Sequence, residues 1–390
     1  MAMNVFGIAA SAWQILYTSY DPMNKVQFAT PATLLVPSNS NHSNRPADMK
    51  PVLVYSLAYD SASKLCGPSY QASNKSLGLS DAGEMAFVQL ALLQGITVVL
   101  PDYEGPNGAF TVGPIEGNGV LDALRATLSF KPVVPDRTKA KVVLKGYSGG
   151  SIATGWALQQ QPSHAPELLP YIAGASLGGI PRDLKATLQF LNGGPFSGLV
   201  LSAFAAYDNV FAPISSFFDT ILNLPGLSAL RNTQTLCTTE EQAQYSSIDI
   251  FKQFTTLTFT EVIGSPLISP LLTDLTLANP QGSAPFSVPQ VPIFVYSSQT
   301  DNVVPHSGTQ EYVDVLCQNN VASVSYANVL NGDHVHTEEL IGPRQSWDFL
   351  SQRLFDPAPA PTGCVTSVID PAQQPNITIT DIIRGIQSLF

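Results

Sequence analysis

Charged residues are scarce in this chain of 390 residues, where they account for 12% against roughly 25% in an average soluble protein. Basic residues are the scarcer kind, because 18 Lys and Arg stand against 29 Asp and Glu and the formal net charge is −11. Without a basic cluster to meet phosphates, the sequence argues against a nucleic-acid partner. The 44% of hydrophobic residues predicts a large apolar core and argues against intrinsic disorder.

Long apolar runs are missing as well. No stretch reaches the roughly 18 consecutive apolar residues that a membrane span needs. The most apolar region, 196–218, is interrupted by Asp208, Asn209 and Pro213, so we predict a soluble protein without stable membrane insertion. Residues 1–16 lack a basic region ahead of their apolar residues, and we interpret them as the start of a mature chain rather than as a signal peptide.

Cysteine is rare, and its spacing argues against one class of site. The four cysteines are Cys66, Cys237, Cys317 and Cys364. None belongs to a C-x-x-C pair, so we predict neither a zinc site nor a redox site and no metal. An even number of cysteines is typical of two structural disulfides in an oxidising compartment. Three N-glycosylation sequons begin at Asn41, Asn74 and Asn376, and together with paired cysteines they favour secretion.

Short β-branched runs alternate with helical patterns along the chain. Strands are predicted over 33–36, 52–56, 96–100, 142–144, 171–176, 292–297 and 321–329. Helices are predicted over 87–93, 120–130 and 152–160. Strands separated by helices predict an α/β fold with a mostly parallel central sheet and right-handed crossovers.

The alternation of strand and helix patterns stops between residues 179 and 280. This region is apolar, is punctuated by Gly and Pro, and has helical patterns with few strand signals. We interpret 179–280 as a mainly helical cap inserted into a core formed by 1–178 and 281–390. A second independent domain is the alternative interpretation.

The chain contains one G-x-S-x-G pattern, which spans Gly146 to Gly150 with Ser148 at its centre. It follows the apolar run 142–144 and precedes small residues that can begin a helix. This strand–turn–helix context is typical of a nucleophile elbow, in which a strained turn raises the serine hydroxyl above the sheet. An ordinary turn between a strand and a helix is the alternative, because glycines and serines also cluster there.

A serine nucleophile needs a histidine to take its proton and a carboxylate to orient that histidine. In α/β-hydrolases the three residues follow in the order Ser, acid, His. Asp301 lies in the loop after the predicted strand 292–297, at the edge of the sheet where catalytic groups of open α/β folds gather. We therefore expect Asp301 to be the acid, with a role as a turn or helix-cap residue as the alternative.

Three histidines follow the serine and the acid in the required order. His334 and His336 lie in a turn after the predicted strand 321–329, and we expect only one of them to reach Ser148. His306 follows Asp301 too closely to be the favoured base, so we expect it at the rim of the pocket.

The tetrahedral intermediate of ester hydrolysis carries an oxyanion, which needs preorganised hydrogen-bond donors. The backbone N–H of Gly149, directly after the serine, is one candidate. The loop 56–63, after an early predicted strand, offers a second N–H from Asp60 or a neighbour.

The chain resembles the fungal secretory lipases, which are α/β-hydrolases, over nearly its whole length. The matching segments are AWQILY at 12–17, 33–37, 59–61 with Cys66, 68–69, PDYEG at 101–105, 121–125, the elbow at 146–150, DNVVP at 301–305, and DH at 333–334 followed by WDFL at 347–350. The resemblance implies His334 as the base, because in the family the histidine is preceded by a small or acidic residue and followed by a tryptophan. It also implies an oxyanion hole of Asp60 and Gly149, and a helical cap that shapes an acyl tunnel.

The same resemblance implies two disulfides, Cys66–Cys237 and Cys317–Cys364. The first would connect the oxyanion loop with the cap, and the second would connect the C-terminal segment with the sheet.

These patterns predict a secreted serine carboxyl-ester hydrolase that uses Ser148, His334 and Asp301 and needs no cofactor. Lipases of the family carry a longer C-terminal tail that forms a flap, whereas this sequence ends at Phe390. We therefore expect a small-molecule ester with a short or acetyl acyl group as substrate, with a lipid substrate and triacylglycerol lipase activity as the alternative. A peptidase and a non-catalytic binding module are less favoured.

Overall fold

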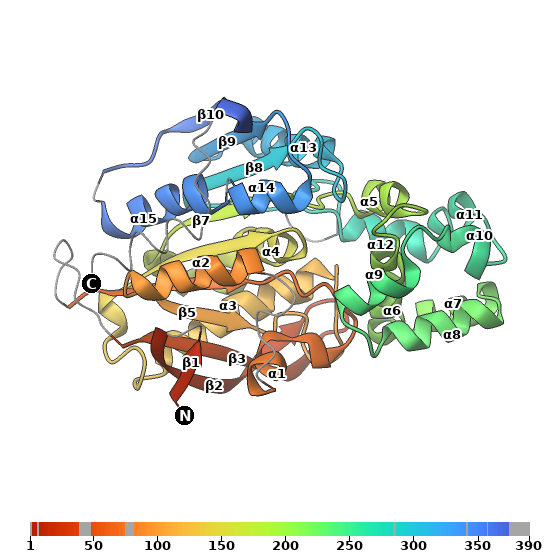
Figure 1. Ribbon diagram of the computed structural model, residues 1–390, viewed down its shortest axis with the longest axis horizontal. Coiled ribbons are helices and arrows are strands. Elements are labelled where there is room, and N and C mark those ends of the chain that lie inside the picture. Colours follow the sequence, from red (N-terminus) through yellow and green to blue (C-terminus); the bar gives the residue numbers. More distant parts are fainter. Residues whose placement is uncertain are drawn as a thin grey trace.

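One sheet of ten strands forms the centre of the molecule, in the order β1-β2-β3-β5-β4-β6-β7-β8-β9-β10 (Figure 1). The computed structural model describes residues 2–5, 8–38, 48–74, 82–283, 286–340, 342–356 and 358–373. The strands are β1 Ala2–Val5, β2 Ile8–Asp21, β3 Val26–Pro37, β4 Lys50–Ser56, β5 Thr97–Pro101, β6 Ala140–Tyr147, β7 Ile172–Gly178, β8 Ile293–Ser298, β9 Ser323–Val329 and β10 Gly363–Ile369. The strands predicted from the sequence correspond to β3 through β9, and the α/β-hydrolase fold is confirmed.

Strand direction divides the sheet into two parts. From β5 to β10 all neighbours run parallel, whereas β1, β2 and β3 form an antiparallel edge that joins β5. Parallel strands need crossover connections, and helices supply them here. Strands β4 to β8 are buried along most of their length and are mainly apolar runs, which explains why the sequence predicts them well, whereas β10 is largely exposed.

Helices cover both faces of the sheet and build two separate cores. The helices of this part are α1 Pro68–Ser73, α2 Ala82–Leu93, α3 Gly113–Ser129, α4 Gly149–His164, α13 His306–Gln318, α14 His334–Leu340 and α15 Trp347–Phe355, with short helical turns η1 Lys64–Cys66, η2 Arg137–Lys139, η3 Pro166–Tyr171, η4 Gly342–Ser346 and η5 Pro371–Gln373. Helices α3, α4 and α13 contribute to the larger core, and α2 and α15 pack on the opposite face. The predicted helices correspond to α2, α3 and α4.

The segment between β7 and β8 is helical and lies at one end of the molecule (Figure 1). Its helices are α5 Leu184–Leu191, α6 Gly198–Val210, α7 Ala212–Ile221, α8 Leu224–Thr233, α9 Thr238–Tyr245, α10 Ile250–Phe254, α11 Phe259–Ile263 and α12 Ile268–Asp274. We call α5 to α12 the helical insertion. Its helical character agrees with the expected cap, and the division of the chain at 179 and 280 stays a prediction. Within the described residues, no helix combines the length and the apolar character that crossing a membrane requires.

Candidate active site

Ser148 occupies a strained turn between β6 and α4. Its backbone has φ 51° and ψ −127°, a conformation that is costly for a residue with a Cβ. The flanking glycines explain how the turn closes. A Cβ on Gly146 would lie 2.1 Å from the Gly150 carbonyl oxygen, and one on Gly150 would lie 2.0 Å from the carbonyl oxygen of Ser56. The G-x-S-x-G pattern therefore reflects close backbone packing around an elbow.

Asp301 and His334 form a buried pair. His334 Nδ1 lies 2.7 Å from Asp301 Oδ2, and the two side chains are 8% and 1% exposed. The other carboxylate oxygen of Asp301, Oδ1, accepts hydrogen bonds from the backbone N–H groups of Val303 at 2.9 Å and Val304 at 2.8 Å. These three contacts leave the carboxylate one orientation, with Oδ2 toward the imidazole.

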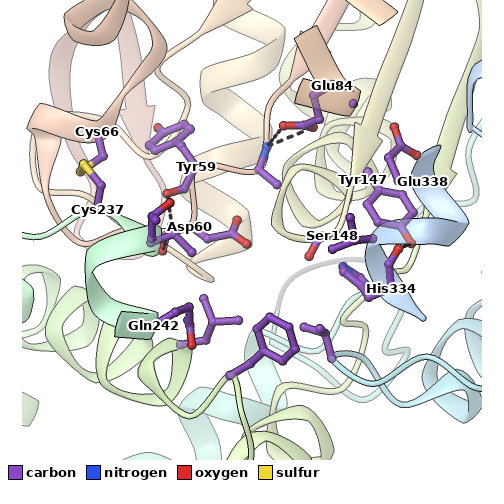
Figure 2. A pocket seen from close by; sticks show the side chains of 18 of the residues that line it. Tyr59, Asp60, Cys66, Glu84, Tyr147, Ser148, Cys237, Gln242, His334 and Glu338 are labelled. Atoms are coloured by element: carbon purple, nitrogen blue, oxygen red, sulfur yellow. Dashed lines mark hydrogen bonds between the residues drawn. A yellow bond between two sulfur atoms is a disulfide. The ribbon is translucent and has the colours of Figure 1, made fainter. Parts of the chain in front are cut away.

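Tyr147 and Asn302 hold His334 in place through its backbone. The Tyr147 hydroxyl donates to the His334 carbonyl oxygen at 2.7 Å, and the two rings lie 4.8 Å apart. The backbone N–H of His334 donates to Asn302 Oδ1 at 3.0 Å. In the described part of the chain, Nε2 of His334 has no hydrogen-bond partner. His334 and Ser148 line the same pocket and lie next to each other on one side of it (Figure 2).

The other two candidate histidines lie elsewhere. His336 is 63% exposed and pairs with Asp333 Oδ2 at 2.7 Å, and this carboxylate raises the pKa of His336. His306 lies 3.0 Å from the Ser297 hydroxyl and is not among the residues that line the pocket. The expectation that His306 lies at the pocket rim is therefore wrong, because this contact holds its ring at the beginning of α13.

Gly149 and Asp60 lie together beside the serine. Gly149 is the first residue of the 16-residue helix α4, so its N–H has no acceptor within the helix. Asp60, in the loop after β4, has φ 42°, and its Oδ1 lies 1.9 Å from where a Cβ on Gly149 would be. Both oxygens of the Glu84 carboxylate, in α2, lie within hydrogen-bond distance of the Ala58 N–H, at 3.1 and 3.3 Å, which ties this loop to α2 (Figure 2).

Two cavities meet at Ser148. The outer pocket has a volume of about 410 Å³, and the inner cavity has a volume of about 30 Å³. The outer pocket is lined from the core by Tyr147, Ser148, His334 and Glu338, and from the helical insertion by Phe196, Leu199 and Gln242 (Figure 2). The inner cavity lies under the insertion and is lined by Gly149, Ile152, Leu184, Leu188, Leu191, Ala203 and Val303, among others. Its wall is largely apolar, in contrast to the mixed wall of the outer pocket.

Three buried carboxyl groups interact electrostatically with Asp60. Burial raises the pKa of Glu104 and Glu116 well above the usual range, and raises the pKa of Glu241 to about 8. The carboxylate of Asp60 contributes to the increase in all three. Their neutral forms are favoured, which limits negative charge next to the position of an oxyanion.

The structure contains two disulfides. Cys66–Cys237 joins η1, just after the Asp60 loop, to the beginning of α9 in the helical insertion. Cys317–Cys364 joins α13 to β10, a strand that the sequence did not predict. In the described ranges, no group of three or more His, Cys, Asp or Glu side chains is arranged to hold a metal ion.

Of the three sequon asparagines, Asn74 lies in the described part of the chain. Asn74 is exposed at the end of α1, and its amide donates to the Tyr70 carbonyl oxygen at 3.2 Å. Asn41 and Asn376 lie outside the described residues, and glycosylation at all three stays a prediction.

Several residues of the site were not anticipated from the sequence. Tyr147, inside the G-x-S-x-G pattern, supports His334, and Glu84 supports the Asp60 loop. Glu338 lines the outer pocket from α14. For Tyr147 the position next to Ser148 was a usable signal, because it lies inside the G-x-S-x-G pattern and therefore close to the pocket. Glu84 and Glu338 carried no such signal, since their partners are distant in sequence.

The sheet order and the serine elbow together define the class of this protein, an α/β-hydrolase. A sequence model of the secretory lipase family matches residues 70–360. The chain is 32% identical to a secreted triacylglycerol lipase of Malassezia furfur over 360 residues, which cover 91% of this chain and 70% of that protein. It is 31% identical to a lipase of Candida albicans over 388 residues, 96% of this chain and 79% of the relative.

A solved structure agrees with these sequence relatives. Candida antarctica lipase A in its closed state superimposes with a TM-score of 0.83 at 27% identity, covering 97% of this chain and 87% of that one. The chain belongs to the secretory lipase family and is a secreted carboxylic ester hydrolase.

Proposed function

We propose that Ser148 is the nucleophile, His334 the general base and then acid, and Asp301 the residue that orients His334. Ser148 Oγ attacks the ester carbonyl carbon while its proton passes to Nε2 of His334. The proton then moves to the oxygen of the leaving alcohol as the carbon–oxygen bond breaks, and an acyl-enzyme remains. Water enters, gives its proton to Nε2 and attacks the acyl carbon, which releases the acid and restores Ser148. The observation that carries this proposal is the buried His334–Asp301 contact, which leaves Nε2 facing the pocket that Ser148 lines.

The oxyanion hole follows from the same geometry. We assign it to Gly149 and Asp60, and the free N–H of Gly149 at the beginning of α4 is the first donor. The α4 dipole adds a favourable field, since the positive end of a helix stabilises a developing negative charge. The loop of Asp60 is adjacent, and its attachment to α2 through Glu84 holds its donors in place.

The positions of the two cavities indicate where the acyl part and the alcohol part of the ester bind. His334 must protonate the leaving alcohol, so the alcohol lies on the side of the outer pocket, which His334 lines. The inner cavity adjoins Ser148 and Gly149 but not His334, so it receives the acyl chain. The proposed substrate is therefore a small-molecule or lipid ester with an apolar acyl group.

The size of the inner cavity favours a short acyl group. Because its volume is about 30 Å³, the inner cavity accepts a few carbons without movement of the helical insertion. The second candidate is a triacylglycerol lipase, which is favoured by the apolar lining and by the name of the Malassezia furfur relative. A long chain would then require α5 and α6 to separate.

A series of p-nitrophenyl esters of increasing acyl length tests the choice. We expect the largest kcat/KM at short chains, and a maximum at long chains would favour the lipase. Leu188→Ala removes a side chain from the wall of the inner cavity and should move the maximum to longer chains. Leu201→Ala is the matched control, because Leu201 is buried in α6 but lines neither cavity. If both variants shift the maximum equally, the acyl group does not occupy the inner cavity.

A phosphonate ester probe tests the nucleophile directly. It should label the wild-type enzyme once per chain, at Ser148, and should not label Ser148→Ala. Labelling at another residue, or full activity of Ser148→Ala, would contradict the proposed mechanism.

A further inference from the structure

A charged side chain is buried in the strand that carries the nucleophile. Lys145 lies in β6, three residues before Ser148, and its side chain is 0% exposed. Its Nζ donates to Glu338 Oε1 at 2.8 Å and to the Tyr296 hydroxyl at 3.1 Å. Glu338 belongs to α14, and its side chain is 7% exposed. The proposed mechanism does not use this ion pair.

Glu338 accepts hydrogen bonds from three parallel strands of the sheet, β4, β6 and β8. Besides Lys145 of β6, the Tyr55 hydroxyl of β4 donates to Oε1 at 3.3 Å, and the Tyr296 hydroxyl of β8 donates to Oε2. These strands lead into the Asp60 loop, the Ser148 elbow and the Asp301 loop. One carboxylate therefore joins α14 to the three strands that lead to Asp60, Ser148 and Asp301.

Helix α14 begins with His334. Glu338 follows four residues later, about one helical turn, so the two side chains lie on the same face of the helix. The helix has only seven residues. Contacts that hold Glu338 in place therefore also fix the orientation of the first turn of α14, which carries His334. In Figure 2, Glu338 and His334 lie on either side of Tyr147.

We propose that Lys145 and Glu338 are a positioning pair, which holds α14 so that Nε2 of His334 stays in reach of Ser148. This inference rests on the proposed roles of Ser148 and His334. Fold stability alone does not call for an ion pair here. Replacing a buried pair by apolar residues of similar size is often neutral or stabilising, whereas removal of one partner leaves an unpaired buried charge. The rings of Tyr55 and Phe87 already pack around Nζ at 5.0 and 4.7 Å, so an apolar side chain has suitable neighbours.

The test uses Lys145→Met, Glu338→Met and the double variant Lys145→Met/Glu338→Met. Active sites are counted by end-point labelling with the phosphonate probe, and kcat and KM are measured well below the Tm of each variant. We expect kcat per active site to fall about 10- to 100-fold in all three, with KM within about threefold, because a shift near 1 Å in a catalytic group costs about 100-fold. The double variant should regain Tm relative to the single variants, since no unpaired charge remains, and its kcat should stay low.

The matched control is Lys139→Met. Lys139 lies just before β6 and pairs with Asp48 at 2.6 Å on the surface, where the two side chains are 48% and 61% exposed. Its kcat should equal that of the wild type. If the double variant regains kcat together with Tm, the pair is structural only and the inference is wrong. That result is distinguishable from failure of the proposed function, which would show as an active Ser148→Ala or His334→Ala variant. Should a single variant not fold, the double variant carries the test.

Discussion

Replacing Asp301 by Asn should stop catalysis with little change in the shape of the site. An Asn side chain has one oxygen and one NH₂ group, so it has two possible orientations. With the oxygen toward the backbone N–H groups of Val303 and Val304, the NH₂ group faces His334 Nδ1. Nδ1 must then be unprotonated, and the proton moves to Nε2. In this tautomer Nε2 cannot accept the proton of Ser148.

The structure also gives the magnitude of this effect. Turning the amide to restore the productive tautomer would place NH₂ against the two backbone N–H groups and leave both unpaired. Each unpaired buried donor costs about 1 to 3 kcal/mol, or about 2 to 6 kcal/mol for two. At about 1.36 kcal/mol per tenfold change in rate, this corresponds to about 30- to 25,000-fold. We expect a kcat loss near the upper end, since the equivalent change in other serine triads costs about 10⁴-fold.

The assay compares kcat for a p-nitrophenyl ester in Asp301→Asn and Asp333→Asn. Asp333 is a matched control, because its Oδ2 also lies 2.7 Å from a histidine Nδ1, that of His336, but on the surface. Asp333 Oδ1 accepts a hydrogen bond from the His336 N–H at 2.9 Å at the beginning of α14, and Asn caps a helix as well as Asp does, so α14 should remain intact. Asp333→Asn should keep kcat within about twofold. A loss below tenfold in Asp301→Asn, with Tm unchanged, would refute the tautomer argument.

Three further predictions concern the base, the buried carboxyls and the elbow. His334→Ala should lower kcat by about 10⁴-fold and His336→Ala by less than about twofold, because only the first contacts the pocket; equal losses would contradict the assignment. Glu241 has a pKa of about 8 when folded against an ordinary 4.5, so its contribution to stability is complete below about 4.5 and is lost as the pH rises to about 8. Glu241→Gln should therefore flatten the fall of Tm between pH 5 and pH 8, and an unchanged slope would count against it. Gly150→Ala places a Cβ 2.0 Å from the Ser56 carbonyl oxygen, so it should lower the free energy of unfolding by about 1 to 3 kcal/mol, measured by urea denaturation. Gly282→Ala is the control, because its Cβ meets nothing closer than 3.4 Å, and it should lower the free energy of unfolding less.

The buried parallel strands β4 to β9 were predictable because burial on both faces gives a strand a distinctive apolar sequence, whereas the largely exposed parallel strand β10 was missed. Strands buried on both faces are short apolar runs, and catalytic groups collect where such strands end. The order of Ser148, Asp301 and His334 therefore placed each residue in a loop at one sheet edge. The choice between His334 and His336 came from family resemblance, since residues two apart cannot be separated by chain order alone.

The antiparallel edge and the supporting contacts were not predictable in the same way. In β2 the apolar residues occupy both faces, and Trp13 and Leu16 are 42% and 74% exposed, so the alternation that marks a half-buried strand is blurred. Lys145 directly follows the apolar run 142–144, and nothing in that run predicts which residue pairs with it. Its partner Glu338 lies 193 residues away, and only the folded chain brings the two together.

Covalent geometry limits how the helical insertion can move. The chain enters it after β7 and leaves it before β8, and two such connections alone would define an axis about which it could swing. Cys66–Cys237 adds a third attachment away from those two, at the beginning of α9. A body held at three separate points cannot rotate as a rigid lid, so a long acyl chain would have to enter through local shifts of single helices. Only reduction of this disulfide would remove the third attachment and allow the helical insertion to rotate about the axis through the other two.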